Sequence, residues 1–384
     1  MIQKSTLPRA VYIHIPFCTN KCHYCDFNSY VLKGQPVQDY LDALEREMER
    51  TVREVPAMGI ETIFVGGGTP TVLLPDQMFR FLQLVNTYFA DRTPSLEFSM
   101  EANPGTTDLE KLQAMKEGGV NRISFGVQSF DNALLHALGR IHNTDDVYRS
   151  LENARTVGFD NLSIDLMFGL PKQTVATMED TLDKALALNL QHYSIYSLKI
   201  EENTLFHTLY HKNKLPLPEE EEELEMYLTI MRRLKAEGYE QYEISNFARP
   251  GYASRHNSAY WRNESYYGIG AGAHGYMRGN RHVNIKGVQE YIDGTLVGLP
   301  ILERVEVSEQ EAMEDFMMVG LRLLSGVRHE EFRRQFGCSM LEVFGRELGE
   351  LTTKHLLIAD AEGYRLSEQG VLFGNEVFAH FLQD

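Results

Sequence analysis

The sequence is poor in the features that mark secreted and membrane proteins. It has four cysteines in 384 residues, and three of them stand together, so a disulfide framework is excluded as the basis of the fold. No run of about 18 apolar residues occurs, and residues 1–17 hold no apolar run of signal-peptide length. These absences predict a soluble, cytoplasmic protein without a transmembrane segment.

Positive charge is also scarce. The chain has 37 lysine and arginine residues against 54 aspartate and glutamate residues, which gives a formal net charge of −17. Nucleic acids and anionic membranes require a cationic surface on the protein that binds them. The charge balance therefore argues against a nucleic-acid partner and favours small molecules or other proteins.

What the sequence does contain is a regular alternation of strand and helix patterns over residues 1–240. Short apolar, β-branched runs occupy 10–17, 62–68, 96–104, 120–128, 161–171 and 192–200. Amphipathic helical patterns lie between them, at 37–52, 76–89, 108–118, 144–158 and 174–188. The repeat predicts an α/β fold with a parallel sheet, and six units favour a partial (β/α)6 TIM-like barrel over a closed eight-stranded one.

The pattern changes in the last third of the chain. Residues 241–306 are rich in glycine, tyrosine and asparagine and predict a connecting segment. Residues 307–384 return to helical periodicity and then to short elements, which predicts a small, mostly helical or winged-helix-like C-terminal domain. Cys338 lies in this part, far from the other cysteines, and is predicted to be a small buried apolar residue.

Polar residues follow several of the predicted strands at the point where each gives way to a loop. They are Gly67 to Thr69, Glu101, Gln128 and Asp165. Barrels and open α/β sheets place their chemistry at the carboxyl ends of parallel strands. We therefore expect the functional site at this edge of the sheet.

Three cysteines lie within eight residues, at Cys18, Cys22 and Cys25. This spacing holds three sulfurs on one tight loop after a strand, which suits a cubane iron–sulfur cluster. A structural zinc site with His14 or His23 as the fourth ligand, and a redox or structural thiol group, remain alternatives. A covalent c-type heme site is excluded, because Asp26 stands where that motif requires histidine.

Three cysteines on four irons would leave one iron with an open coordination site. The spacing resembles the signature of the radical S-adenosylmethionine (radical SAM) superfamily, C-x3-C-x-aromatic-C. This resemblance implies a [4Fe-4S] cluster whose open iron is chelated by the methionyl amine and carboxylate of SAM, with electron transfer able to split the sulfonium to a 5′-deoxyadenosyl radical. The glycine run 66–68, directly after a strand, resembles the superfamily's motif for the methionyl part of SAM.

Further motifs resemble the coproporphyrinogen oxidase-like branch of that superfamily. They are SMEANP, SFGVQSF, LGRIHN and SIDLMFGLPKQT, in that order along the chain. The resemblance implies that SAM is contacted by nine residues: Tyr12, Tyr24, Gly67, Gly68, Thr69, Glu101, Gln128, Arg140 and Asp165. Glu101 and Asp165 would accept hydrogen bonds from the amine or the ribose hydroxyls of SAM.

Two departures distinguish this chain from the oxygen-independent coproporphyrinogen III oxidases of the branch. Those oxidases carry another cysteine two places after the third, where this chain has Phe27, and a sizeable segment before the first cysteine, where this chain has 17 residues. Both departures resemble the heme chaperones of the branch instead. The oxidase reading, a radical oxidative decarboxylation of propionates, remains the alternative.

A second feature resembles the heme chaperones, the H-N-x-x-Y-W motif of residues 256–261. The resemblance implies a heme site formed by His256, Asn257, Tyr260 and Trp261. An imidazole can ligate heme iron, and the two aromatic rings offer flat apolar area; a hydrogen-bonded loop histidine is the alternative for His256. The glycine-rich segment 267–274 has no strand-turn-helix context for NAD and is predicted to line the SAM or heme cavity.

The combined expectation is a heme chaperone that carries a [4Fe-4S] cluster, SAM and heme and transfers the heme to an acceptor protein. A respiratory hemoprotein is one candidate for that acceptor. The radical SAM machinery leaves the question of enzymatic activity open, with the motifs favouring a chaperone without coproporphyrinogen oxidase activity. The resemblance allows either a monomer or a cofactor-dependent dimer.

Overall fold

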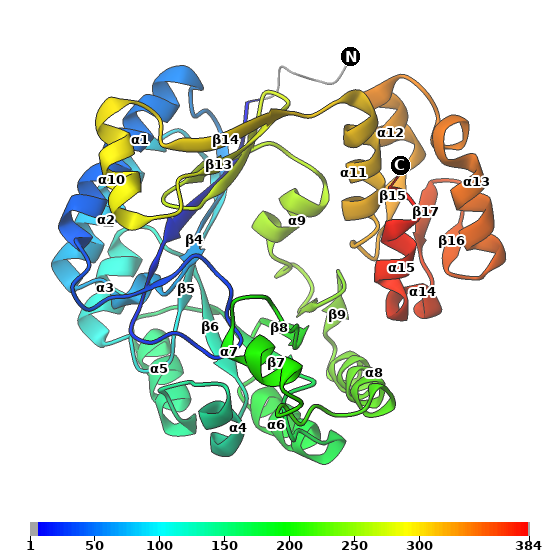
Figure 1. Ribbon diagram of the computed structural model, residues 1–384, viewed down its shortest axis with the longest axis horizontal. Coiled ribbons are helices and arrows are strands. Elements are labelled where there is room, and N and C mark those ends of the chain that lie inside the picture. Colours follow the sequence, from blue (N-terminus) through cyan, green and yellow to red (C-terminus); the bar gives the residue numbers. More distant parts are fainter. Residues whose placement is uncertain (1–6, 383–384) are drawn as a thin grey trace.

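The computed structural model describes residues 7–382, and its centre is a long sheet covered by helices (Figure 1). Six neighbouring strands are parallel: β1 (Ala10–Ile15), β4 (Ile60–Gly67), β5 (Arg92–Ala102), β6 (Arg122–Gln128), β7 (Asn161–Phe168) and β8 (His192–Ser197). The order β1-β4-β5-β6-β7-β8 confirms the predicted partial (β/α)6 barrel.

Helices fill the crossovers between these strands and cover one face of the sheet. They are α1 (Val37–Glu54), α2 (Pro75–Tyr88), α3 (Leu109–Glu117), α4 (Asn132–Ala137), α5 (Thr144–Thr156) and α6 (Val175–Ala187), with a 3-10 turn at Pro70–Val72. Side-chain caps begin several of them, as where Thr174 accepts from the backbone N–H of Thr177. The segments with amphipathic patterns therefore form the crossover helices that were predicted.

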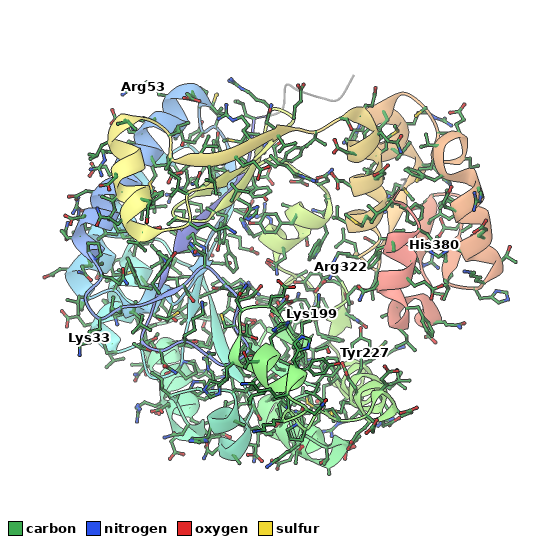
Figure 2. The ribbon with its side chains drawn as sticks, viewed as in Figure 1. Lys33, Arg53, Lys199, Tyr227, Arg322 and His380 are labelled. Atoms are coloured by element: carbon green, nitrogen blue, oxygen red, sulfur yellow. The ribbon has the colours of Figure 1, made fainter. Side chains whose placement is uncertain are left out.

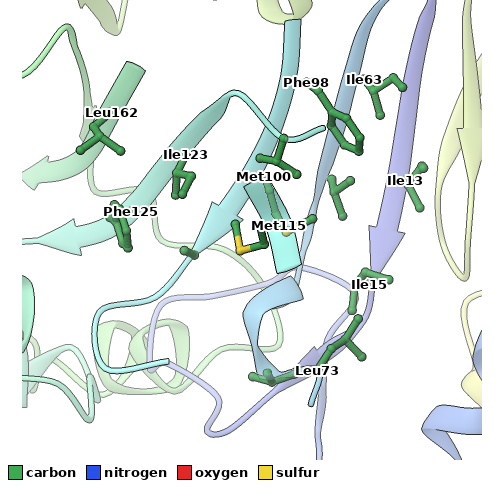
Figure 3. Packing of buried hydrophobic residues seen from close by; sticks show 14 of the residues in the cluster. Ile13, Ile15, Ile63, Leu73, Phe98, Met100, Met115, Ile123, Phe125 and Leu162 are labelled. Carbon is green, nitrogen blue, oxygen red and sulfur yellow. The ribbon is translucent and has the colours of Figure 1, made fainter. Parts of the chain in front are cut away.

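The strands alternate between an apolar face and a polar face. Ile13, Ile63, Met100 and Ile123 are fully buried against the helices, where Figure 3 shows them packed together. Residues one position away, such as Ser99, point to the other face, because side chains alternate along a strand. The inner side of the partial barrel is consequently polar, as a binding interior requires.

The segment after β8 adds to both edges of the sheet. It contains α7 (Leu205–His211), α8 (Glu220–Ala236), β9 (Glu240–Gln241), β10 (Asn246–Ala248), α9 (Arg255–Trp261), β11 (Tyr266–Ile269), β12 (His274–Met277), β13 (Asn280–Asn284), α10 (Val288–Val297) and β14 (Ile301–Glu306). Strand β11 pairs in parallel with β1, and β12 to β14 continue antiparallel from it. Residues 241–306 therefore do more than connect the barrel to the C-terminal domain, because their strands extend the central sheet.

The C-terminal domain contains α11 (Glu309–Gly320), β15 (Val327–Arg328), α12 (His329–Phe336), α13 (Met340–Thr353), β16 (Leu357–Ala359), β17 (Gly363–Leu366), α14 (Glu368–Leu372) and α15 (Gly374–Ala379). Its three short strands form a separate antiparallel sheet, and its helices enclose a separate hydrophobic cluster. This arrangement confirms the mostly helical C-terminal domain.

The C-terminal domain meets the barrel beside α9, where Figure 2 labels Arg322. Its guanidinium carbon lies 4.5 Å from the centre of the Trp261 ring. The backbone N–H of Leu324 donates to the carbonyl of Tyr242 at 3.0 Å. In residues 7–382, no helix combines the length and the apolar character needed to span a membrane.

Candidate cluster and cofactor site

The cysteine loop leaves β1 and is closed by a short parallel pair, β2 (Phe17–Cys18) with β3 (Tyr30–Val31). The N–H of Leu32 donates to the carbonyl of Cys18 at 2.8 Å, and the N–H of His23 donates to the carbonyl of Leu138 at 3.0 Å. The side chain of Asn28 donates to the carbonyl of Ala271 at 2.9 Å. The loop is therefore tied down at both ends and in its middle.

Cys18, Cys22 and Cys25 all line one open cavity of about 680 Å³ at the carboxyl ends of the barrel strands. Within residues 7–382, no three histidine, cysteine, aspartate or glutamate side chains form a group that could hold one metal ion. A cubane differs from a mononuclear site in that it distributes three thiolates over three irons.

Neither nearby histidine is placed as a fourth ligand. The Nε2 atom of His14 contacts the carbonyl of Asn28 at 2.8 Å, and its Nδ1 atom contacts the hydroxyl of Tyr12 at 2.8 Å. The Nδ1 atom of His23 contacts the carbonyl of Ala137 at 2.9 Å. Neither imidazole is among the residues that line the cavity.

The glycine turn at the end of β4 brings backbone close to the cysteine loop. Gly67 has φ +107°, and a Cβ atom there would lie 2.4 Å from the ring of His14. At Gly68 a Cβ would lie 2.6 Å from the carbonyl oxygen of Phe17. Only glycine fits both positions. Next to them, the hydroxyl of Thr69 lies 3.5 Å from the sulfur of Cys18.

Two acidic residues, Glu101 and Asp165, line the cavity. The N–H of Gly67 donates to Oε2 of Glu101 at 3.1 Å, and the hydroxyl of Ser124 donates to Oδ1 of Asp165 at 3.0 Å. Burial, followed by repulsion from Asp165, raises the pKa of Glu101 to about 8, and burial raises the pKa of Asp165. A cationic or hydroxyl-bearing ligand in the cavity would stabilise both carboxylates.

Arg140 links the cavity to the cysteine loop. One Nη atom donates to Oδ1 of Asn103 at 2.6 Å and to the carbonyl of Gly126 at 2.5 Å, while the other lies 3.5 Å from the sulfur of Cys22. Its Nε is buried and has no hydrogen-bond partner in the described part of the chain. An unpartnered guanidinium N–H beside a cavity fits a ligand that carries a carboxylate.

Gln128 has an unusual backbone at the end of β6. Its φ is +69°, and the pairing of β6 with β7 shifts register between Gly126 and Gln128. A bulge at the end of a strand redirects the side chain that follows it, and a left-handed non-glycine residue stores local strain. The bulge places Gln128 among the residues that line the cavity.

The cavity brings together most of the residues predicted to contact SAM: Tyr24, Gly67, Gly68, Thr69, Glu101, Gln128, Arg140 and Asp165. Tyr12 does not line it; its hydroxyl is hydrogen-bonded to Nδ1 of His14, and the charge of Glu101 contributes to the raised pKa of Tyr12. The glycine-rich segment 267–274 also does not line it. Its loop packs beneath the cysteine loop, since a Cβ at Gly272 would lie 2.4 Å from the side chain of Asn28.

The cavity also contains Phe27 and seven residues that the sequence analysis did not name: Asn20, Lys21, Ser29, Ala102, Asn103, Ser124 and Gly126. Asn103 is the most connected of these, because it donates to the hydroxyl of Thr69 at 2.7 Å and accepts from Arg140. The sequence of β6 could have indicated two of these residues. Ser124 and Gly126 are two positions apart, so they lie on the same face of the strand. Asn103 follows directly after the end of β5, so strand alternation does not place its side chain.

Comparison with known proteins identifies the family. Residues 12–185 match the model of the radical SAM superfamily, and residues 307–373 match the HemN C-terminal domain. The heme chaperone HemW of Bacillus subtilis is 46% identical over 97% of this chain and 99% of its own length. The heme chaperone HemW of Escherichia coli is 36% identical over 98% of this chain and 99% of its own length.

This chain belongs to the HemW family of radical SAM proteins. The chain is also similar to the mouse protein 'Radical S-adenosyl methionine domain-containing protein 1, mitochondrial', which is 34% identical over 94% of this chain and 84% of its own length. Membership confirms the predicted family, and radical SAM proteins as a superfamily imply a [4Fe-4S] cluster and SAM.

A solved structure shares the HemW fold seen here. Coproporphyrinogen III oxidase (HemN) from Escherichia coli, described as a radical SAM enzyme, aligns with a TM-score of 0.85 over 98% of this chain and 90% of its own. The two are 24% identical. The likeness shows that the two proteins share the barrel and the C-terminal domain. It does not assign the oxidase activity to this chain.

The motif H-N-x-x-Y-W of this HemW family member forms the short helix α9, which is packed inside the molecule. The ring of His256 is completely buried, and its Nδ1 atom lies 2.9 Å from the hydroxyl of Thr62. Its Nε2 atom lies 2.9 Å from the hydroxyl of Tyr260. Burial, followed by the charge of Arg122, lowers the pKa of His256 to about 3, so the imidazole is neutral.

The start of α9 is fixed to strand β5. The backbone N–H groups of Arg255 and His256 donate to the carboxylate of Glu97 at 3.0 and 3.1 Å, and the hydroxyl of Ser254 caps the helix. At the other end, the Nε1 atom of Trp261 is buried without a partner in residues 7–382. In this conformation α9 closes the barrel interior, and both ring nitrogens of His256 are engaged.

Proposed function

We propose that this chain is a heme chaperone: it binds a [4Fe-4S] cluster through Cys18, Cys22 and Cys25, binds SAM at the open iron, and passes heme to an acceptor protein. The observation that carries the proposal is the single cavity lined by three cysteines together with Glu101 and Arg140. The cysteines alone suit a cluster, and the polar groups beside them suit an amino-acid ligand. The cluster would supply one-electron reducing power and an iron with an open position.

The thiols fit the cluster chemically. Burial raises the pKa of Cys25 to about 11, so a thiolate at this position requires a cation to stabilise it, which iron supplies. Arg140, close to Cys22, adds positive charge on the same side of the loop. His14 and His23 are engaged elsewhere, so the fourth iron position is left to an external ligand.

The remaining cavity residues fit SAM. Glu101 offers a carboxylate to the ammonium group of SAM, whose positive charge would lower the raised pKa of this acid. Asp165 would accept from the ribose hydroxyls, and the Nε of Arg140, which has no hydrogen-bond partner among the described residues, would donate to the carboxylate. The glycine turn brings backbone close enough for the methionyl part.

Phe27 supports the chaperone over the oxidase. Its side chain is 61% exposed at the cavity, at the position where the oxidases carry a further cysteine. A phenylalanine cannot serve as a ligand or a proton donor, but it offers apolar area beside the cluster loop. Three bacterial relatives that match over 97–100% of this chain carry the name heme chaperone HemW.

Heme binding is proposed at the motif residues His256, Asn257, Tyr260 and Trp261. Because both ring nitrogens of His256 are engaged, its ligation of heme iron through Nδ1 requires α9 to move away from Thr62, while Tyr260 on the same helix can keep its hydrogen bond to Nε2. The contacts that hold α9 to the barrel and to Arg322 would then control access to heme.

A transfer assay tests the function. Protein loaded with heme and reconstituted under anaerobic conditions is mixed with membranes from heme-deficient cells, and the recovery of respiratory activity is measured. We expect recovery above that given by the same amount of free hemin, and loss of this advantage in Cys18→Ala. Cys338→Ala is the matched control, because Cys338 lies outside the cavity.

The same protein, given SAM, a reductant and coproporphyrinogen III, separates the chaperone from the oxidase. The proposal predicts no catalytic formation of protoporphyrinogen. Formation at catalytic rates, or heme transfer no better than free hemin, would overturn it.

A further inference from the structure

Two histidines on α7 lie one helical turn apart with their rings facing each other. The Nε2 atoms of His207 and His211 are 3.0 Å apart. Their ring centres are 4.3 Å apart, with the ring planes at 70°. His207 is half-buried and His211 is exposed, so both nitrogens are reachable from solvent. Positions i and i+4 on one helix are a spacing at which two imidazoles can share one metal ion.

The helix that carries this pair is held firmly. The hydroxyl of Thr204 caps it by accepting from the N–H of His207 at 3.1 Å. Phe206 is buried in a small hydrophobic cluster, and its N–H donates to the carbonyl of His23 at 3.0 Å. A pair of ligands on a fixed scaffold loses less freedom on binding than a pair on a mobile loop.

We propose that His207 and His211 chelate one divalent transition metal ion that prefers ligand angles near 90°, as Ni²⁺ and Cu²⁺ do. Two nitrogens at bond lengths of about 2.0–2.1 Å lie about 2.8–3.0 Å apart when that angle is about 90°, and about 3.3–3.4 Å apart in a tetrahedral site. In the structure a hydrogen bond between the two rings spans this distance, 3.0 Å, so an ion with angles near 90° could replace the shared proton with little movement of either ring.

The geometry distinguishes a free ion from heme iron. The two axial nitrogens of a heme lie on opposite faces of the macrocycle, about 4 Å apart, whereas these two lie side by side. The pair occupies two adjacent positions and leaves the others to water or to a side chain from another molecule. The net charge of −17 favours a cation at the surface.

The site is separate from the cluster cavity, because no residue of α7 lines that cavity. It is nevertheless connected to the cysteine loop through Phe206, whose ring centre lies 6.1 Å from that of His23. A bound ion would cross-link one turn of α7 and restrain the element on which the loop rests. The inference does not depend on heme or SAM binding.

The test is a calorimetric titration of the cluster-loaded protein with NiCl₂, since a loaded cluster occupies the cysteine thiols. We expect one Ni²⁺ per chain at micromolar concentration and a loss of affinity of about tenfold or more in His207→Ala and in His211→Ala. His380→Ala is the control. His380 follows helix α15 in the C-terminal domain, away from α7, so its replacement should leave binding unchanged.

His211→Gln provides a second variant, since His211 is exposed and its replacement leaves the packing of α7 intact. Ni²⁺ should also slow amide hydrogen exchange across α7 in the wild type and not in this variant. Unchanged affinity in the two alanine variants, or tighter stoichiometric binding of hemin than of Ni²⁺ that the same variants abolish, would overturn the proposal.

Discussion

The surroundings of Glu101 and Asp165 in the cavity disfavour ionisation and raise the pKa of both acids. Burial removes water from both carboxylates, and the charge of Asp165 repels that of Glu101. Glu101 therefore keeps its proton up to about pH 8, although its ordinary pKa is 4.5. A ligand that brings an ammonium group replaces the missing solvation and allows the charge to form.

This shift predicts a stability difference that depends on pH. Between pH 4.5 and pH 8 the folded protein binds a proton at Glu101 that the unfolded chain has released, so its stability falls as the pH rises through this window. Glu101→Gln cannot ionise and still accepts from Gly67. In cluster-free, SAM-free protein, it should be more stable than the wild type by roughly 1–3 kcal/mol at pH 8, and the gain should vanish near pH 4.5.

Urea unfolding at pH 5, 6.5 and 8 measures this difference. A gap between the two proteins that stays constant over the range would contradict the raised pKa. Ser124→Ala is a useful companion, because it removes a hydrogen bond to Asp165 and leaves Glu101 in place.

Gly67 is the second residue on which the site depends. Its φ of +107° is strained for any side chain, and an alanine Cβ would meet the ring of His14. We expect Gly67→Ala to cost about 1–3 kcal/mol of unfolding free energy and to weaken SAM binding, because the turn and His14 would both shift. Gly345→Ala is the control: it lies on α13 with no atom within 4 Å of its Cβ and should not destabilise the protein.

At the scale of elements, α9 is closed onto the barrel by a chain of hydrogen bonds from Thr62 through His256 to Tyr260. If heme binds after α9 opens, the measured affinity is reduced by the small fraction of open molecules. Weakening the closed state should then strengthen heme binding.

Thr62→Val tests this point. It removes the partner of Nδ1 in His256 and leaves a buried polar atom unsatisfied, which costs the closed state about 1–3 kcal/mol. Hemin titration followed by the Soret band should show an affinity higher by roughly tenfold, and His256→Ala should alter the band itself. A Thr62→Val protein that binds hemin no better than wild type would count against opening of α9.

Much of the arrangement could be predicted from sequence because local patterns and simple rules determine it. Alternate residues such as Ile63 and Ile123 define which face of each strand meets the helices. The carboxyl ends of parallel strands meet at one edge, so Glu101, Gln128 and Asp165 were expected close together and line one cavity. Cys338 was expected to be buried, but it is only half-buried.

Other placements depended on contacts between distant parts of the chain. The pairing of β11 with β1 joins residues more than 250 positions apart, and no local pattern indicates it. Tyr12 sits one hydrogen bond away from the cavity because His14 lies between it and Gly67. The burial of His256 follows from a seven-residue helix that fits into the barrel, which its short sequence could not indicate.

At the scale of the whole molecule, the C-terminal domain rests on α9 through Arg322 and Trp261. Trp261 is the only tryptophan in the chain, so its fluorescence reports on this contact alone. We expect Arg322→Ala to shift the emission to longer wavelength and to cost about 1 kcal/mol, because the stacked cation is lost and water reaches the indole.

Steady-state fluorescence of the folded protein measures the shift. Arg346→Ala is the matched control, since Arg346 pairs with Glu350 on the exposed surface of α13. Emission that does not move in Arg322→Ala, or that moves equally in the control, would show that the domain contact does not shield α9.

The central claim is that three cysteines hold a [4Fe-4S] cluster whose open iron is taken by SAM. Electron paramagnetic resonance of the dithionite-reduced, reconstituted protein, recorded with and without SAM, tests it most directly. The account predicts a reduced-cluster signal whose g-values change when SAM is added, and no such signal in Cys22→Ala. A wild-type signal that SAM leaves unchanged, or no cluster signal at all, would contradict it.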